Sequence, residues 1–401
     1  MNRKSHFGVF LLLSIVAVTS TCWGQPTEQI IYTFRNRLDG GYPNSGLTMD
    51  GAGNLYGAAE TGGITGHGTV FELTPNGVGG WTETVLYNIG VNVLDGIQPL
   101  GGVVFDSQGN LYGTTSSGGS LGYGVIYKLS PTANGWTETG LYPFNGVNGE
   151  NPNATLIVDS ADNVYGTTAY GGPHSKGVVF ELVGGEIRLL HGFTGLGDGA
   201  GPLSTLALDK AGRIYGTTTT GGGDDAGVVF QLTLVNGIWK ESVLYSFTRG
   251  VGIGDCPVGG VILDSQENLY GTTYRNGAAG TNGGVFKLTR ISSRKWSYSI
   301  LYAFQGPTDG NMPGASLVFD TTGNLYGTTQ LGGNRRLGTV FELSPTASGQ
   351  WDEAFLYSFQ GGRDGANPIT TALVLDALGN VYGTTAYGGT ADTGVVFEIT
   401  P

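Results

Sequence analysis

The sequence predicts an all-β protein, a seven-bladed β-propeller built from four-stranded antiparallel blades. The fragment Tyr-Gly-Thr-Thr, or a close variant, recurs seven times at intervals of 50 to 56 residues. Short apolar segments surround each copy in a fixed order and show no helical periodicity. A period of this length is typical of units that bury their apolar faces only against one another. The repeat tyrosines are Tyr56, Tyr112, Tyr165, Tyr215, Tyr270, Tyr326 and Tyr382.

The first 24 residues are expected to be a signal peptide. Arg3 and Lys4 precede an apolar run at 7–18, which is shorter than the ~20 residues of a membrane-spanning helix. Cleavage is predicted before Gln25, which would leave one propeller domain, 25–401, in the periplasm or outside the cell. The alternative is a lipoprotein acylated on Cys22.

The charge balance bears on the partners of the mature chain. Loss of Arg3 and Lys4 leaves 17 of the 19 Lys+Arg against 31 Asp+Glu, a net charge of −14. An acidic surface repels phosphate backbones and anionic lipid, so no nucleic acid partner is expected. Cys256 would be the only remaining cysteine, so the mature chain can form no intrachain disulfide. We expect a monomer without a membrane span.

Each repeat opens with two strands joined by an Asp-x-x-Gly-Asn turn. In the sixth repeat the strands are expected at 316–319 and 324–329, on either side of Asp320. The carboxylate can accept backbone N–H groups across the turn, and the glycine can adopt a positive φ. We therefore interpret these aspartates as turn caps, not as metal ligands or catalytic groups. The seven are Asp50, Asp106, Asp159, Asp209, Asp264, Asp320 and Asp376.

The rest of the repeat supplies two more strands and a connection. The glycine within Tyr-Gly-Thr-Thr weakens its strand, which predicts close packing of an aromatic side chain from a neighbouring sheet. In the sixth repeat the third and fourth strands are expected at 338–343 and 351–359. A D-G-x-x-P connection follows, in which Asn148 and Ile253 replace two of the aspartates. Its prolines are Pro43, Pro99, Pro152, Pro202, Pro257, Pro313 and Pro368.

The two ends of the chain predict a closed ring. The seventh repeat stops after its third strand, at 394–401. The missing fourth strand is present near the beginning, where 30–34 match 356–359 of the sixth repeat. The N-terminal strand is therefore expected to complete the last blade, which also removes two exposed sheet edges.

Three motifs carry a resemblance to a known family. L-x-x-D-x-x-G-N-L-Y-G-T-T, G-V-V-F-E-L-T-P and W-x-E-x-x-L-Y-S-F resemble the tandem GloVer repeat of the choice-of-anchor group of secreted bacterial proteins. The resemblance covers nearly all of the mature chain and implies an exported bacterial protein with a propeller-like array. The chain ends inside a blade at Pro401, without the anchoring tail of that group, so a released protein is expected. The hairpin alone is similar to NHL, gluconolactonase and strictosidine-synthase-like propellers, and this carries over no catalytic residues.

Candidate ligand-binding residues come from the loops between the second and third strands. These loops and the connections between blades are expected on one face of the ring, and their side chains differ among repeats. This variety predicts a site for a polar extracellular ligand, such as a carbohydrate or a protein. Solvated loop tips without a ligand are the alternative. The candidates are His67, Tyr123, Tyr170, His174, Asp224, Asp225, Arg275, Arg335 and Arg336.

Metal and catalytic motifs are weak in this sequence. The mature histidines His67, His174 and His191 lack metal-ligand spacing, and Asp224-Asp225 lacks the pattern of a calcium loop. The string G-x-S-x-G occurs once, at 118–122 within a glycine-rich loop, and no nucleophile elbow is expected there. We expect no metal and no cofactor, and catalytic residues cannot be named.

Two classes of function follow. The favoured one is a secreted binding or interaction propeller. The alternative is a secreted hydrolase or lyase that acts on a polysaccharide or a small lactone in the central funnel. Tryptophans that begin the fourth strands could stack sugars, but packing between strands is the favoured interpretation. They are Trp81, Trp136, Trp239, Trp296 and Trp351.

Export gives the first testable prediction. When the full-length chain is expressed in a secretion-competent bacterial host, N-terminal sequencing of the purified protein should begin near Gln25. A soluble cytoplasmic product that retains Met1 would contradict it.

Overall fold

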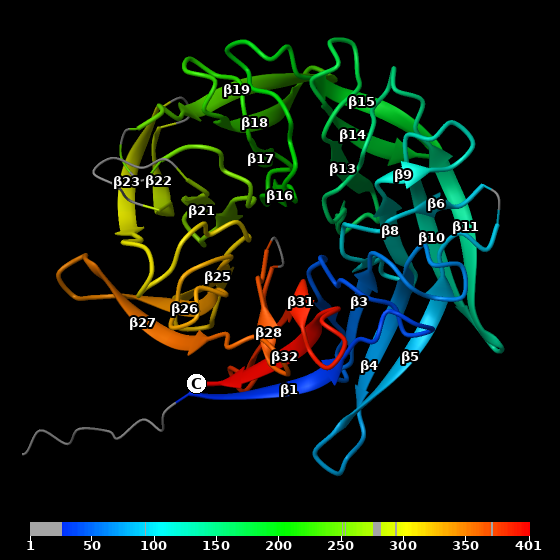
Figure 1. The fold of residues 1–401 in the computed structure, drawn as a ribbon. Helices are drawn as coiled ribbons and strands as arrows, with labels where there is room; N and C mark the ends of the chain where they lie inside the picture. The colour runs from blue at the N-terminus through cyan, green and yellow to red at the C-terminus, as the bar shows by residue number, and fades with distance from the viewer. Residues whose placement is uncertain are drawn as a thin grey trace, which may run out of the picture.

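The computed structural model contains seven four-stranded antiparallel sheets arranged around a central axis (Figure 1). It describes residues 26–401 except 93, 251, 253, 276–281, 293–294 and 370–371. The predicted signal peptide and Ile253 therefore lie outside the described residues. The all-β propeller with seven four-stranded blades is confirmed.

Each blade runs outward from a short inner strand to a long outer strand. The inner strands are β2 (Thr48–Met49), β7 (Val104–Phe105), β12 (Ile157–Val158), β16 (Ala207–Leu208), β20 (Ile262–Leu263), β24 (Val318–Phe319) and β29 (Val374–Leu375). The second strands, which carry Tyr-Gly-Thr-Thr, are β3 (Leu55–Ala59), β8 (Leu111–Thr115), β13 (Val164–Thr168), β17 (Ile214–Thr218), β21 (Leu269–Thr273), β25 (Leu325–Thr329) and β30 (Val381–Thr385).

The third strands are β4 (Thr69–Pro75), β10 (Val125–Thr132), β14 (Val178–Val183), β18 (Val228–Val235), β22 (Gly284–Ser292), β26 (Thr339–Pro345) and β32 (Val395–Thr400). The outer strands are β5 (Trp81–Asn88), β11 (Gly135–Pro143), β15 (Glu186–Gly192), β19 (Ile238–Ser246), β23 (Lys295–Ala303), β27 (Trp351–Ser358) and β1 (Thr27–Thr33). We number the blades 1 to 7 in chain order of their inner strands.

Two small sheets were not predicted from the sequence. β6 (Gly96–Ile97) pairs with β9 (Ser117–Gly118), and β28 (Gly365–Ala366) pairs with β31 (Tyr387–Gly388). Each joins the connection that enters a blade to the loop between the second and third strands of that blade. Both kinds of loop therefore lie on one face of the ring, here called the loop face. The opposite face carries the Asp-x-x-Gly-Asn turns and is called the turn face.

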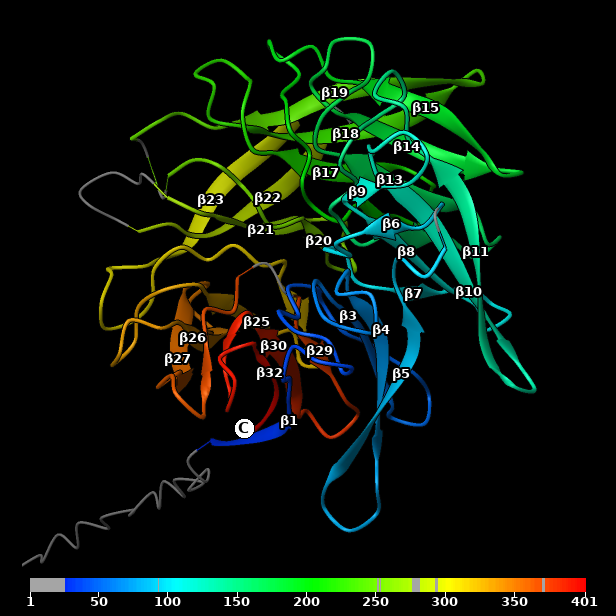
Figure 2. The ribbon, with the colours of Figure 1, turned by 45° about the vertical axis from the view of Figure 1, so that its right-hand side comes forward.

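The N-terminal strand closes the ring, as predicted. β1 pairs antiparallel with β32, with Thr27 opposite Thr400 and Thr33 opposite Val395. In Figure 2, β1 lies as the outer strand of the sheet that contains the C-terminus. Residues from the two ends of the described chain thus share one blade.

The repeat glycine is packed differently from the prediction. Gly327 lies opposite Phe341 of the neighbouring strand, and a Cβ on Gly327 would lie 2.5 Å from the tip of that ring. The aromatic partner therefore comes from the same sheet, not from a neighbouring one. A phenylalanine ring lies over a glycine in the facing strand and covers backbone that would otherwise be bare.

The turn aspartates cap their turns in all seven blades. In each copy, one carboxylate oxygen accepts the backbone N–H groups two and four residues later, as Asp320 does from Thr322 and Asn324, both at 2.8 Å. The same contacts are made by Asp50, Asp106, Asp159, Asp209, Asp264 and Asp376. This geometry supports the turn-cap interpretation.

The hydrophobic core is divided among the junctions between blades. The described core forms seven clusters, and each combines residues from two adjacent blades. At the 7/1 junction, Phe34 from the end of β1 contacts Phe71 of blade 1 with ring centroids 5.1 Å apart. A single blade therefore cannot bury its own apolar face.

Proline and glycine fix the spacing between adjacent blades. The glycine that precedes each third strand lies against the connection proline of the next blade; a Cβ on Gly68 would lie 2.6 Å from the ring of Pro99. This contact occurs at all seven junctions. The amide just before each proline also donates to a loop carbonyl of the previous blade, as Gln98 does to His67 at 3.1 Å. The invariant proline and the backbone amide before it thus both act across a junction.

Removing β1 tests ring closure. A chain that begins at Phe34 should expose the edge of β32, and its Tm should fall by more than about 10 °C or it should aggregate. Removal of 77–79 from the β4–β5 hairpin tip, where Val78 is 88% exposed, should have little effect. Equal melting curves for the full and truncated chains would show that β1 does not close the ring.

A turn aspartate can be tested separately. Asp320→Ala leaves two turn amides without their acceptor, so the free energy of unfolding should fall by about 1 kcal/mol. Asp320→Asn keeps an acceptor oxygen and should lose less. Urea unfolding of both variants measures the difference. Equal stabilities for the alanine variant and the parent would refute the capping role.

Candidate functional site

The central channel opens on the loop face into a cavity of about 250 Å³, here called the channel mouth. Its walls are the residues that follow each repeated proline and lead into the inner strand. All seven blades contribute. The described lining residues are Asn44, Gly46, Leu100, Gly101, Asn153, Ala154, Thr155, Leu203, Ser204, Thr205, Val258, Gly259, Gly260, Gly314, Ser316 and Ile369.

Small residues line the channel because the inner ends of the blades converge there. A Cβ on Gly101 would lie 2.6 Å from the carbonyl oxygen of Ala154 in the next blade. A Cβ on Gly259 would lie 2.5 Å from that of Ala315. Glycine, alanine, serine and threonine are accordingly frequent in the second and third positions after the proline. Backbone groups therefore come close to the cavity.

A threonine of Tyr-Gly-Thr-Thr holds this wall in place. Its hydroxyl donates to the carbonyl oxygen two residues after the proline of the next blade, as Thr217 does to Gly259 at 3.0 Å and Thr272 does to Ala315 at 3.1 Å. Thr384 makes the same bond to Ser45 across the ring closure. The shape of the channel mouth thus depends on contacts between blades.

The chemistry of the channel mouth is uncharged. Among its described lining residues there is no acidic or basic side chain, and the polar groups are amides, hydroxyls and backbone. The side-chain oxygen of Asn153 is buried without a hydrogen-bond partner among the described residues. Glu60 lies beside the mouth, where it accepts from the amide of Asn44 at 2.7 Å and from that of Gln98 at 3.5 Å.

The nine candidates from the sequence lie in loops of the loop face, and none of them lines the channel mouth. Asp225 accepts the amide of Gly221 at 2.8 Å and pairs with Arg249, so it organises its own loop. Tyr123 packs beside Gly146. The other candidates are exposed at loop tips: His67, Tyr170, His174, Asp224, Arg275, Arg335 and Arg336. A ligand-binding role for these nine stays a prediction.

The sequence did contain a signal for the channel residues that were missed. The position after each repeated proline varies widely, with Asn44, Leu100 and Asn153 in the first three blades. A variable residue beside an invariant one is a candidate for function. Its direction toward the axis could not be known before the inner strands were placed.

The repeat tryptophans pack between blades. The ring of Trp81 in blade 1 lies 5.9 Å from that of Tyr382 in blade 7, and Trp351 lies 6.2 Å from Tyr270 of the preceding blade. Both contacts are edge-to-face, which is a favourable packing geometry for aromatic rings. The contacts support the packing interpretation over sugar stacking.

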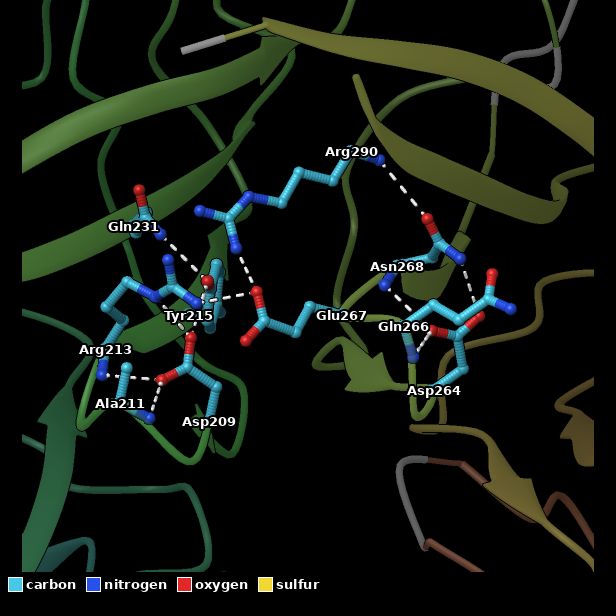
Figure 3. A network of polar contacts seen from close by, with 10 residues as sticks. All are labelled: Asp209, Ala211, Arg213, Tyr215, Gln231, Asp264, Gln266, Glu267, Asn268 and Arg290. Carbon is cyan, nitrogen blue, oxygen red and sulfur yellow. Dashed lines mark hydrogen bonds and ion pairs between the residues drawn. The ribbon is translucent and has the colours of Figure 1, made fainter. Parts of the chain in front are cut away.

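The turn face carries a cross-blade ionic network (Figure 3). Arg213 of blade 4 pairs with its own turn residue Asp209 at 2.5 Å and with Glu267 of blade 5 at 2.7 Å. Arg290 also pairs with Glu267. The turns beside this junction border a separate cavity of about 310 Å³. Since the carboxylates in the network are neutralised by arginines, we assign it to blade joining.

Neither a metal cluster nor a membrane helix is found in the part of the chain that the structure describes. There, no three His, Cys, Asp or Glu side chains are grouped in a way that could hold a metal ion. Nor does any helix there have the length and apolar character needed to cross a bilayer.

Fold and channel together define a seven-bladed propeller with an uncharged axial cavity. A family model described as the Gloeobacter/Verrucomicrobia repeat matches residues 17–223, 68–281 and 280–401. The chain therefore belongs to the Gloeobacter/Verrucomicrobia repeat family, as the motifs indicated. No curated protein matches the sequence.

Solved structures share the fold at low sequence identity. A protein from Bacteroides uniformis assigned as a 6-phosphogluconolactonase is 14% identical, with a TM-score of 0.54 over 82% of this chain and 88% of that one. A puromycin-hydrolyzing peptidase from Mycobacterium tuberculosis is 13% identical, with a TM-score of 0.52 over 85% of this chain and 48% of that one. At such identities the likeness concerns the fold alone.

Proposed function

We propose that this protein is an exported binding propeller that holds a small, neutral, polar ligand, such as the end of a glycan, at the channel mouth. The observation that carries the proposal is the uncharged lining, which combines hydrogen-bonding groups and apolar side chains from all seven blades. Ligand sites combine apolar walls with a few polar groups that orient the ligand.

Charge and size favour this class of ligand. A charged ligand would lose hydration in the cavity without meeting an opposite charge, which is costly. A hydroxyl-rich neutral ligand could instead bond to Asn153, Thr155, Ser204 and nearby backbone groups. The volume of about 250 Å³ is slightly below the usual range of ligand pockets, so it suits a small group better than a long chain.

The lining also favours binding over catalysis. General acid–base chemistry needs a titratable group within hydrogen-bond reach of the reacting atom. Glu60 is an acidic residue beside the mouth, and its carboxylate is occupied by two side-chain amides. A secreted hydrolase or lyase remains the alternative that the experiment must separate.

The test is a glycan array on the mature protein, followed by calorimetry with the best ligand and by a panel of generic hydrolase and lactone substrates. Leu203→Trp should fill the channel mouth and weaken binding at least tenfold. Its Tm should stay close to that of the parent, because Leu203 borders open space in the cavity. Lys210→Trp places the same side chain at an exposed site on the turn face and should leave the affinity unchanged.

Two outcomes would contradict the proposal. Substrate turnover that Leu203→Trp abolishes would make the channel mouth an active site. Binding that persists in Leu203→Trp but is lost in Arg335→Ala or Asp225→Ala would instead place the ligand on the outer loops.

A further inference from the structure

Five of the seven junctions hold a pair of carboxyl groups between neighbouring outer strands. One carboxyl is a glutamate on the outer strand of a blade, usually the third residue of W-x-E. The other is the aspartate of the D-G-x-x-P connection that enters that blade. A tyrosine, or in one case a histidine, from the outer strand of the previous blade bonds to the aspartate. The five sets are Glu83/Asp39/Tyr32, Glu138/Asp95/Tyr87, Glu241/Asp198/His191, Glu353/Asp309/Tyr302 and Glu28/Asp364/Tyr357.

The two sets that involve the closing strand show the arrangement. At the 7/1 junction, the hydroxyl of Tyr32 on β1 donates to Asp39 at 3.2 Å, and the carboxyl group of Glu83 on β5 lies near both. At the 6/7 junction, Tyr357 donates to Asp364 at 3.0 Å and bonds Glu28 of β1. One carboxylate oxygen of each glutamate is buried without a hydrogen-bond partner among the described residues. β1 therefore takes part in two of the five sets, with Tyr32 in one and Glu28 in the other.

The remaining two junctions have lost both members of the pair together. At the 2/3 junction, Asn148 replaces the aspartate and Ile187 the glutamate. At the 4/5 junction the sequence has Ile253 and Tyr298 in these positions, and Tyr298 stacks on Tyr245 at 4.3 Å. Joint loss at both junctions indicates that the two carboxyls act as one unit.

The same two junctions instead have polar contacts between the turns of neighbouring blades on the turn face, here called ties. Asp162 of blade 3 accepts the amide of Ser107 in blade 2 at 2.8 Å and its hydroxyl at 2.6 Å. At the 4/5 junction, Glu267 pairs with Arg213 (Figure 3). Asp162 and Glu267 occupy the turn glycine position with φ of 63° and 62°, a conformation that costs energy for these residues. The strain indicates that the ties replace a contact that the other junctions obtain differently.

Two facing, half-buried carboxylates repel each other unless one is protonated. Burial, followed by the charge of the facing aspartate, raises the pKa of Glu28, Glu83, Glu138, Glu241 and Glu353 from 4.5 to about 7. No lysine or arginine among the described residues forms an ion pair with any of the five glutamates. The folded chain therefore holds protons that the unfolded chain releases above pH 4.5.

The other groups that face these pairs do not reverse the effect. They are the tyrosines and aspartates of the five sets, Tyr127 near Glu138, Arg35 near Tyr32, and His174 near His191. Burial raises the pKa of the tyrosines, which stay protonated and neutral at pH 5 to 8. Burial lowers the pKa of His191, so it is mostly neutral above its ordinary value of 6.5.

We propose that, in each of the five pairs, a proton on the glutamate lets the two carboxyl groups join neighbouring blades. The ring is therefore most stable at mildly acidic pH, and the closing strand β1 detaches as the pH rises past neutral. The sign follows from linkage: a glutamate with a raised pKa contributes stability that is complete below its unfolded value and is lost as the pH rises through about 7. The turn aspartates work in the opposite sense. Hydrogen bonds lower the pKa of Asp50, Asp159, Asp209, Asp264 and Asp320, so their contribution is lost only in stronger acid.

The experiment compares the Tm of the mature protein at pH 5 and pH 8 with that of Glu28→Gln/Glu83→Gln. Glutamine keeps the size and a hydrogen-bonding end but cannot titrate. The parent should melt at a lower temperature at pH 8. Since two of five glutamates are removed, this drop should shrink by about two fifths in the variant. Between pH 5 and pH 8, the rate of hydrogen exchange in β1 of the parent should rise by more than the ordinary effect of pH on amide exchange. Most of this extra rise should be absent from the variant.

The matched control is Glu186→Gln/Asp352→Asn, which removes the same number of charges at exposed positions on outer strands. It should keep the full drop in Tm. An equal drop in the parent and the glutamine variant would overturn the proposal. If the variant fails to fold, the carboxyl ¹³C shifts of the parent's glutamates decide: five should titrate near pH 7, and titration of all of them near 4.5 would also overturn it.

Discussion

The contact between a proline and a glycine at every junction is the constraint on which the rest of the molecule depends. The proline lies in the connection that enters one blade, and the glycine lies before the third strand of the preceding blade. A Cβ at that position would collide with the proline ring. Because glycine has no Cβ, the two blades can approach to the distance at which their apolar faces meet. The hydrogen bond from the backbone amide before the proline then fixes the position of one blade along the ring axis relative to the other.

This close approach has a cost in backbone conformation. The residue before the proline has a φ of 55° to 60° at Tyr42, Gln98, Asn151, Cys256, Met312 and Asn367. Side chains such as tyrosine and methionine rarely adopt this conformation, which costs on the order of 1 kcal/mol each. It persists because it directs the amide to the previous blade. Stability thus lies in the junctions, where the carboxyl pairs and the turn-face ties are two solutions to one problem.

Radial packing also decides the character of the channel. Seven inner strands can converge only if the residues beside them are small, so backbone and short polar groups surround the axis. Near the axis, variation is concentrated in the residue after the proline, and on the loop face it is concentrated in the loops between the second and third strands. The sequence located the outer loops, because their charges and aromatic rings differ visibly among repeats. It did not identify Asn153 or Leu203, because their direction toward the axis depends on where the blade ends in space.

The repeated motifs by themselves determined the blade count, the four-strand order, the turn caps and the closure by β1. Each of these follows from residues close together in the chain or from a match between its two ends. Tertiary structure decided the partner of Gly327, which lies in its own sheet, and the pairing of Glu83 with Asp39 and of Glu28 with Asp364. Every outer-strand glutamate looks like an ordinary exposed residue in the sequence. Only the approach of neighbouring blades places a second carboxyl beside it and changes its chemistry.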